Sequence, residues 1–109
     1  MKRKKPVRLD EVAEQEVSEA RGWYESKRRG LGDEMLGCLA EALESIERHP
    51  EAAHRVEGYE NANVRSAPME RFPYRIIYVL LRDRCRVVAF AHDHRGPDYL
   101  RLRLKDLPD

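Results

Sequence analysis

RFPYRIIYVLL at residues 71–81 and VVAFAHDHR at residues 87–95 are the two runs that decide the fold. Both are rich in β-branched and aromatic residues, and a short polar turn at 82–84 lies between them, which is the pattern of a β-hairpin. The second run is apolar on both of its faces, so we expect a central strand. It ends in two histidines and Arg95, which places titratable and cationic groups at the rim of a sheet.

The length and composition predict one small domain. The chain of 109 residues can form a single domain, residues 1–109, with one modest core. No apolar run approaches the ~20 residues of a membrane helix, and no apolar segment of a secretory signal follows the basic N-terminus. Cys38 and Cys85 lack metal-binding spacing and are expected as reduced, buried side chains. We therefore expect a cytoplasmic protein with no membrane partner, no metal and no cofactor.

Charge is distributed unevenly along the chain. Residues 1–63 carry 11 Lys and Arg against 14 Asp and Glu, whereas residues 64–109 carry 10 against 6. In the basic half, arginine outnumbers lysine nine to one. Arginine is well suited to bind phosphate or an acidic partner. The alternative, a solvated charged surface, stays open because 38% of all residues are charged.

Two helices are predicted before the hairpin. Apolar residues at 13, 17, 20 and 24 form one helical face, with Asp10 as a candidate N-cap. Leu36, Leu39, Leu43 and Ile46 form a second stripe, which follows a glycine-containing turn at 30–32 and ends before Pro50. The short turn predicts an antiparallel helix pair. We expect core positions for Trp23 and Tyr24, and contact of the second helix with the strands that hold Ile77 and Val88.

The remaining segments are short. Residues 7–9 predict a first strand, residues 51–63 a surface loop, and residues 64–69 an edge or bulged strand that contains Pro68. Residues 98–107 alternate leucine with arginine or lysine, a period of two that indicates a strand or an extended arm. The predicted fold class is α+β, with the order β-α-α-β-β-β.

This order and several short motifs resemble the RelE/ParE superfamily of toxins from bacterial toxin–antitoxin modules, especially the plasmid-stabilisation proteins. The resemblance covers roughly residues 9–103. The matching residues are Ala20, Trp23-Tyr24, Gly30-Leu31-Gly32-Asp33-Glu34, His49-Pro50, Arg65, Phe72-Pro73-Tyr74, Tyr78 and His92-x-x-Arg95-x-Pro97. The chain departs from the family at Tyr99, near the place where many members have a tryptophan.

The resemblance implies a two-helix hairpin packed on one face of a twisted antiparallel sheet. It also implies the toxin component of a type II toxin–antitoxin system, neutralised by a cognate antitoxin in a hetero-oligomer. Two activities occur in the superfamily. One is ribosome-dependent cleavage of mRNA, which we take as the first hypothesis, and the other is inhibition of DNA gyrase without chemistry of its own. An inactive, toxin-like binding module is a third possibility.

Four residues are candidates for RNA cleavage. Metal-independent cleavage requires a base for the 2′-hydroxyl, an acid for the leaving oxygen, and cations for the phosphate. The unperturbed pKa of a histidine side chain lies near neutral pH, so His92 is the candidate acid or base. Arg65 and Arg95 can supply the cations, and Tyr99 a second proton donor. The structural alternatives are a hydrogen bond of His92 within the sheet and an ion pair of Arg65 with a nearby carboxylate.

Nucleic-acid binding is predicted for four further arginines. They are Arg71, Arg75, Arg101 and Arg103. Their alternative role is solubility. Tyr74 and Tyr78 lie on one face of a strand, where they either stack on bases or pack beneath the helices. The near-neutral net charge of +1 favours the gyrase hypothesis, because RNA-binding toxins are expected to be more basic.

Overall fold

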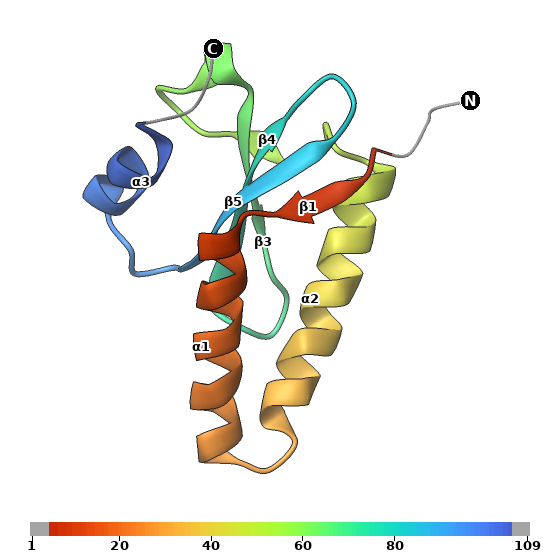
Figure 1. Ribbon diagram of the computed structural model, residues 1–109, viewed down its shortest axis with the longest axis vertical. Coiled ribbons are helices and arrows are strands. Elements are labelled where there is room, and N and C mark those ends of the chain that lie inside the picture. The colour runs from red at the N-terminus through yellow and green to blue at the C-terminus, as the bar shows by residue number, and fades with distance from the viewer. Residues whose placement is uncertain (1–4, 106–109) are drawn as a thin grey trace.

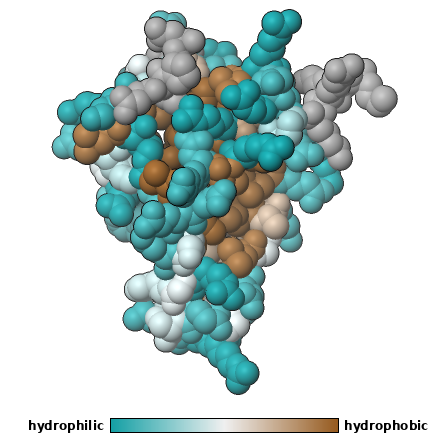
Figure 2. Space-filling view, in the orientation of Figure 1, coloured by the Kyte–Doolittle hydropathy of each residue, from teal (hydrophilic) through white to brown (hydrophobic). Residues whose placement is uncertain are grey.

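A five-stranded sheet separates two unequal helical layers (Figure 1). The computed structural model describes residues 5–105, and its strands lie in the order β1-β5-β4-β3-β2. α1 and α2 form a hairpin on one face of the sheet, and α3 lies on the other. In the same orientation, most of the visible surface is hydrophilic, and hydrophobic residues gather near its middle (Figure 2). The elements are β1 (Val7–Leu9), α1 (Glu11–Lys27), α2 (Leu31–Arg48), β2 (His54–Arg55), the 3-10 turn η1 (Glu60–Ala62), β3 (Val64–Pro68), β4 (Tyr74–Leu80), β5 (Cys85–His92) and α3 (Pro97–Leu104).

The sheet is mixed, although the sequence analysis expects an antiparallel one. The pairs β2-β3, β3-β4 and β4-β5 are antiparallel. β1 pairs parallel to β5, with Val7 opposite Cys85 and Leu9 opposite Val87. The chain enters β1 at the end where β5 begins, so the two strands run in the same direction. The predicted α+β class, the element order and the helix pair on one face are confirmed.

Each face of the sheet has its own apolar cluster, and a bulge in β5 changes which residues of this strand face which cluster. Ile77 lies opposite Ala89 and Tyr78 opposite Val87, so Val88 is the extra residue. Ile77 and Val88 consequently belong to the cluster under α3, and the expectation that they lie under the helix pair is wrong. Leu39 is buried in the other cluster, as predicted.

The helix pair is closed by contacts across its turn. Gly30 has φ +90°, a left-handed conformation that favours glycine. The Glu25 carboxylate accepts hydrogen bonds from the backbone N–H groups of Gly30 and Gly32 at 2.8 and 2.9 Å, which satisfies free donors at the start of α2. The predicted side-chain cap at Asp10 is wrong. Its carboxylate accepts hydrogen bonds from Nε of Arg86 at 2.8 and 3.1 Å and thereby ties the start of α1 to β5.

The predicted strand or extended arm over residues 98–107 is instead a helix, α3, as far as the described residues reach. Pro97 occupies its first turn, where a missing N–H has no cost. In a helix, Leu100 and Leu104 share one face, and both pack on the sheet, while Leu102 points outward and is 67% exposed. The surface loop predicted for 51–63 contains the two-residue strand β2 and the turn η1.

Candidate functional site

Two of the predicted catalytic residues, His92 and Arg95, lie at the carboxyl end of β5 and just after it. His92 lies opposite Tyr74 on β4, and the centroids of the two rings are 5.2 Å apart. Its Nδ1 accepts a hydrogen bond from the backbone N–H of His94 at 3.1 Å, so the proton of the neutral ring belongs on Nε2. Arg95 is exposed, and its guanidinium lies 5.0 Å from the centroid of the Tyr99 ring.

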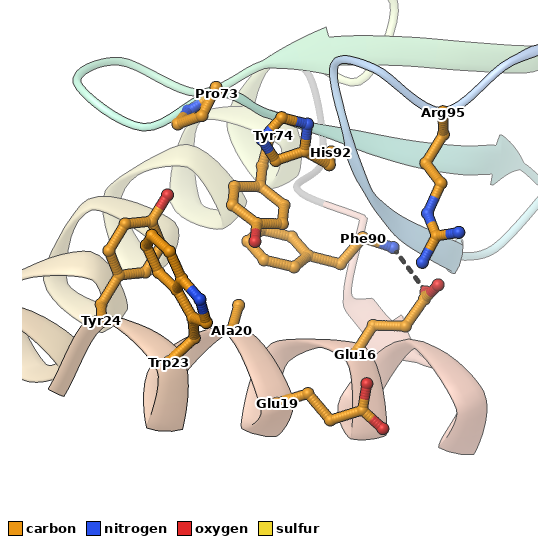
Figure 3. Close-up of a pocket in the computed structure, with 10 residues that line it drawn as sticks. All are labelled: Glu16, Glu19, Ala20, Trp23, Tyr24, Pro73, Tyr74, Phe90, His92 and Arg95. Atoms are coloured by element: carbon orange, nitrogen blue, oxygen red, sulfur yellow. Dashed lines mark hydrogen bonds between the residues drawn. The ribbon is translucent and has the colours of Figure 1, made fainter. Parts of the chain in front are cut away.

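A groove of about 470 Å³ lies between α1 and the ends of β4 and β5 (Figure 3). We call it the helix-face groove. The stacked rings of Tyr74 and Phe90, 4.5 Å apart, form part of its wall. Trp23, expected in the core, is 55% exposed and lies beside the groove with its edge toward Tyr24, which is buried as predicted. The other lining residues are Glu16, Glu19, Ala20, Pro73, His92 and Arg95.

A cluster that we call the Glu16 clasp fastens α3 to α1 and β5. Its members are the carboxylate of Glu16, the hydroxyl of Tyr99, the guanidinium of Arg103 and the backbone N–H of Phe90. Tyr99 donates to Glu16, and Arg103 donates to both carboxylate oxygens at 2.9 and 3.1 Å. The N–H of Phe90 donates to the same carboxylate at 3.0 Å, while Arg103 also donates to the carbonyl of Val88 at 2.8 Å.

The clasp makes Tyr99 a poor acid and covers a free strand edge. Burial, together with the Glu16 hydrogen bond and charge, raises the pKa of Tyr99 well above its usual range. β1 pairs only with residues 85–87, so the next residues of β5 have no strand on that side. Glu16 and Arg103 satisfy the N–H of Phe90 and the carbonyl of Val88 there. Tyr99 therefore holds α3 in place, and its proton is already shared with a carboxylate.

Arg65 lies apart from the other predicted catalytic residues. It is opposite Tyr78 on β4, four positions from the residue that faces His92, which places it on the order of 15 Å from His92. Arg65 is only 7% exposed, and it donates to the carbonyls of Glu51 and Ala53 at 2.8 and 2.9 Å and to Oδ1 of Asn63 at 3.1 Å. The expected carboxylate ion pair is replaced by these neutral acceptors. Arg65 anchors the 51–63 segment.

The four arginines predicted to bind nucleic acid are scattered. Arg71 forms an ion pair with Glu34 at 2.8 Å, and hydrogen bonds from Arg28 and Arg71 lower the pKa of Glu34 to about 2. Arg101 pairs with Asp98 within α3, and Arg103 belongs to the Glu16 clasp. Arg75 lies in a cavity, and it has no carboxylate partner among the described residues.

That cavity, of about 230 Å³, is on the face of the sheet that carries α3, and we call it the second-face cleft. Nε of Arg75 donates to Oγ of Ser66 at 2.7 Å, which fixes the guanidinium at the wall. The cleft is lined chiefly by residues of β2, β3, β4, the end of β5 and the start of α3, and by the segment between β5 and α3. It meets the helix-face groove at His92 and Arg95, which line both cavities.

Sequence reasoning missed Glu16, His54 and Ser66. Glu16 is three residues after Ala13 and four before Ala20, so it flanks the buried stripe of α1, a position that a helical projection would have marked. No sequence pattern connects His54 or Ser66 with Arg75. Within residues 5–105, no cluster of three or more histidine, cysteine, aspartate or glutamate side chains could hold a metal ion, and no helix there is long and apolar enough to cross a membrane.

Comparisons with known proteins identify the family. The chain matches no curated protein. Among solved structures it is similar to a chain of the chromosomal ParDE toxin–antitoxin system from P. aeruginosa, with 12% sequence identity and a TM-score of 0.70 over 81% of this chain and 95% of that one. At this identity the likeness concerns the fold alone. The profile of the family described as the ParE toxin of the type II toxin–antitoxin system, parDE, matches residues 7–97. The protein therefore belongs to the ParE toxin family.

Proposed function

We propose that this protein arrests growth by binding DNA gyrase, and that it does not cleave mRNA. One observation carries the proposal: the four residues of the cleavage hypothesis do not converge on one point. Arg65 is bound to carbonyl oxygens on the order of 15 Å from His92. Tyr99 shares its proton with Glu16. His92 and Arg95 alone lack the second proton-transfer group that cleavage requires. Membership of the ParE family supports the same choice.

The partner that neutralises the toxin is a cognate antitoxin, and we propose that it covers the helix-face groove. The groove combines the exposed ring of Trp23 with an aromatic wall made of the partly buried ring of Tyr74 and the buried ring of Phe90, which suits an apolar anchor. Glu19, which forms no ion pair among the described residues, adds negative charge to the groove, so the bound segment is expected to carry a lysine or arginine.

Pulse-labelling after induction in cells tests the proposed target. A gyrase inhibitor stops DNA synthesis first and induces the DNA-damage response, while translation continues. An mRNA endonuclease stops translation first and leaves cleaved messages. Co-expression of the antitoxin is expected to restore growth in either case. If the protein slows neither process at high expression, it is an inactive binding module.

Two variants separate binding from catalysis. His92→Ala removes the candidate acid or base, and Tyr99→Phe removes only the phenolic hydroxyl. Both variants are expected to remain toxic if no chemistry takes place, provided that circular dichroism shows a folded protein. Two results together would reinstate the endonuclease hypothesis. One is a folded His92→Ala variant that has lost its toxicity, and the other is mRNA that the wild type cleaves and this variant leaves intact.

A further inference from the structure

The second-face cleft contains positive charge that the chain does not neutralise. Eight arginines of the described residues form ion pairs with carboxylates: Arg21, Arg28, Arg48, Arg71, Arg84, Arg86, Arg101 and Arg103. Arg75 and Arg95 form none among residues 5–105, and both line this cleft. Asp93 is the one acidic residue that lines the cleft within the described part of the chain.

Arg75 is also held in position before any ligand arrives. Its Nε donates a hydrogen bond to Oγ of Ser66, a buried residue that is 9% exposed, so a fixed contact directs the terminal nitrogens. A guanidinium fixed in this way loses little conformational entropy when it binds an anion. A pair of arginines with free terminal nitrogens suits the oxygens of phosphate groups.

The cleft offers bases little aromatic surface for stacking. Its rings are those of Tyr99, which has two arginine guanidinium groups each at 5.0 Å from its centroid, and the imidazoles of His54 and His92. The stacked rings of Tyr74 and Phe90 pack in the cluster on the opposite face of the sheet. Proteins that bind single strands combine cations with exposed aromatic rings. Cations with so little aromatic surface beside them favour contact with the backbone of a duplex.

We infer that the second-face cleft binds backbone phosphates of duplex DNA, without reading the base sequence. The choice of DNA rests on the proposed function, because DNA gyrase acts on duplex DNA. The toxin would then touch both the enzyme and the DNA on which the enzyme acts. Arg75 and Arg95 are the phosphate contacts, and Ser66 positions Arg75.

Fluorescence anisotropy of the full-length protein with a labelled 20-base-pair duplex tests the inference in the absence of gyrase. We expect a Kd of about 10⁻⁴–10⁻⁶ M near physiological salt, the range of non-specific binding. Each phosphate contact contributes about 0.9 to the slope of log K against log salt. Arg75→Ala and Arg95→Ala should each reduce the slope by about 0.9. Arg82→Ala, which removes the same charge from the exposed 82–84 turn, should leave it unchanged.

Several results would overturn the inference. One is a slope of log K against log salt that is equal in the wild type and the three variants. The others are tighter binding of single-stranded RNA or DNA than of the duplex, and no binding of the duplex at 50 mM salt. A plasmid supercoiling assay, run separately, reports on the proposed function. A toxin that inhibits gyrase but binds no duplex contradicts only the DNA contact. A toxin that binds the duplex through Arg75 and Arg95 but leaves gyrase active contradicts only the choice of target.

Discussion

Replacing Glu16 by alanine should destabilise the fold more than any other change of a surface carboxylate. The change removes the shared acceptor of Phe90 N–H, the Tyr99 hydroxyl and the Arg103 guanidinium. Loss of one partner from a fully buried ion pair costs about 3–5 kcal/mol. The side chains of Arg103 and Glu16 are 21% and 17% exposed, so water partly compensates the loss. We expect the free energy of unfolding to fall by about 2–4 kcal/mol.

Urea denaturation followed by circular dichroism measures this loss, and a thermal scan should show a midpoint lower by on the order of 10–25 °C. Glu19→Ala is the matched control. It removes the same charge one turn further along α1, where the side chain is exposed, and should change stability by no more than about 0.5 kcal/mol.

A double-mutant cycle then isolates the ion pair. Glu16→Ala and Arg103→Met should be coupled by at least about 1 kcal/mol, since the two side chains contact each other directly. If Glu16→Ala costs no more than Glu19→Ala, the clasp does not hold α3 on the sheet. The assignment of a structural role to Tyr99 would then lose its basis as well.

Four further outcomes are expected. Leu39→Ala should cost about 2–5 kcal/mol in urea denaturation, and Leu43→Ala less, because Leu39 is 6% exposed whereas Leu43 is only partly buried; equal costs would contradict this packing. Arg65→Ala should lower the free energy of unfolding by about 2–4 kcal/mol, and the protein that remains folded should still be toxic. A variant that is folded but not toxic would contradict a purely structural role for Arg65. Gly32→Ala should lower the melting temperature, since its Cβ would lie 2.7 Å from a backbone carbonyl oxygen. The raised pKa of Tyr99 keeps this phenol protonated in the folded state. Stability should therefore be retained below the ordinary tyrosine pKa of 10.0 and fall as the pH rises above it. Tyr99→Phe should reduce that fall in denaturation curves at pH 9–11.

Local periodicity was sufficient to predict the helix pair and the long strands, but not α3. In the helix pair, apolar residues recur every three or four positions over about three turns, which only a helix explains. The segment of α3 has eight residues, and Leu100 and Leu104 satisfy both a period of two and a spacing of four. Pro97 at its first turn was the signal that favoured the helix.

The composition of the candidate site depends on contacts between residues distant in the sequence. His92 and Arg95 are three residues apart in the chain, so the sequence alone places them near each other. Glu16 meets Tyr99 and Arg103 across separations of 83 and 87 residues, and Arg65 meets carbonyl groups that any residue possesses. Neither kind of partner leaves a pattern in a single sequence, so these contacts could not be predicted from it.

Inhibition of DNA supercoiling by the purified protein tests the proposed target most directly. Relaxed plasmid, ATP and gyrase are incubated with increasing toxin, and a parallel translation reaction receives the same amounts. We predict loss of supercoiling with wild-type protein and with Tyr99→Phe, relief by the cognate antitoxin, and intact messages in the translation reaction. Undiminished supercoiling at toxin in large excess over gyrase, accompanied by cleaved messages, would contradict the proposal.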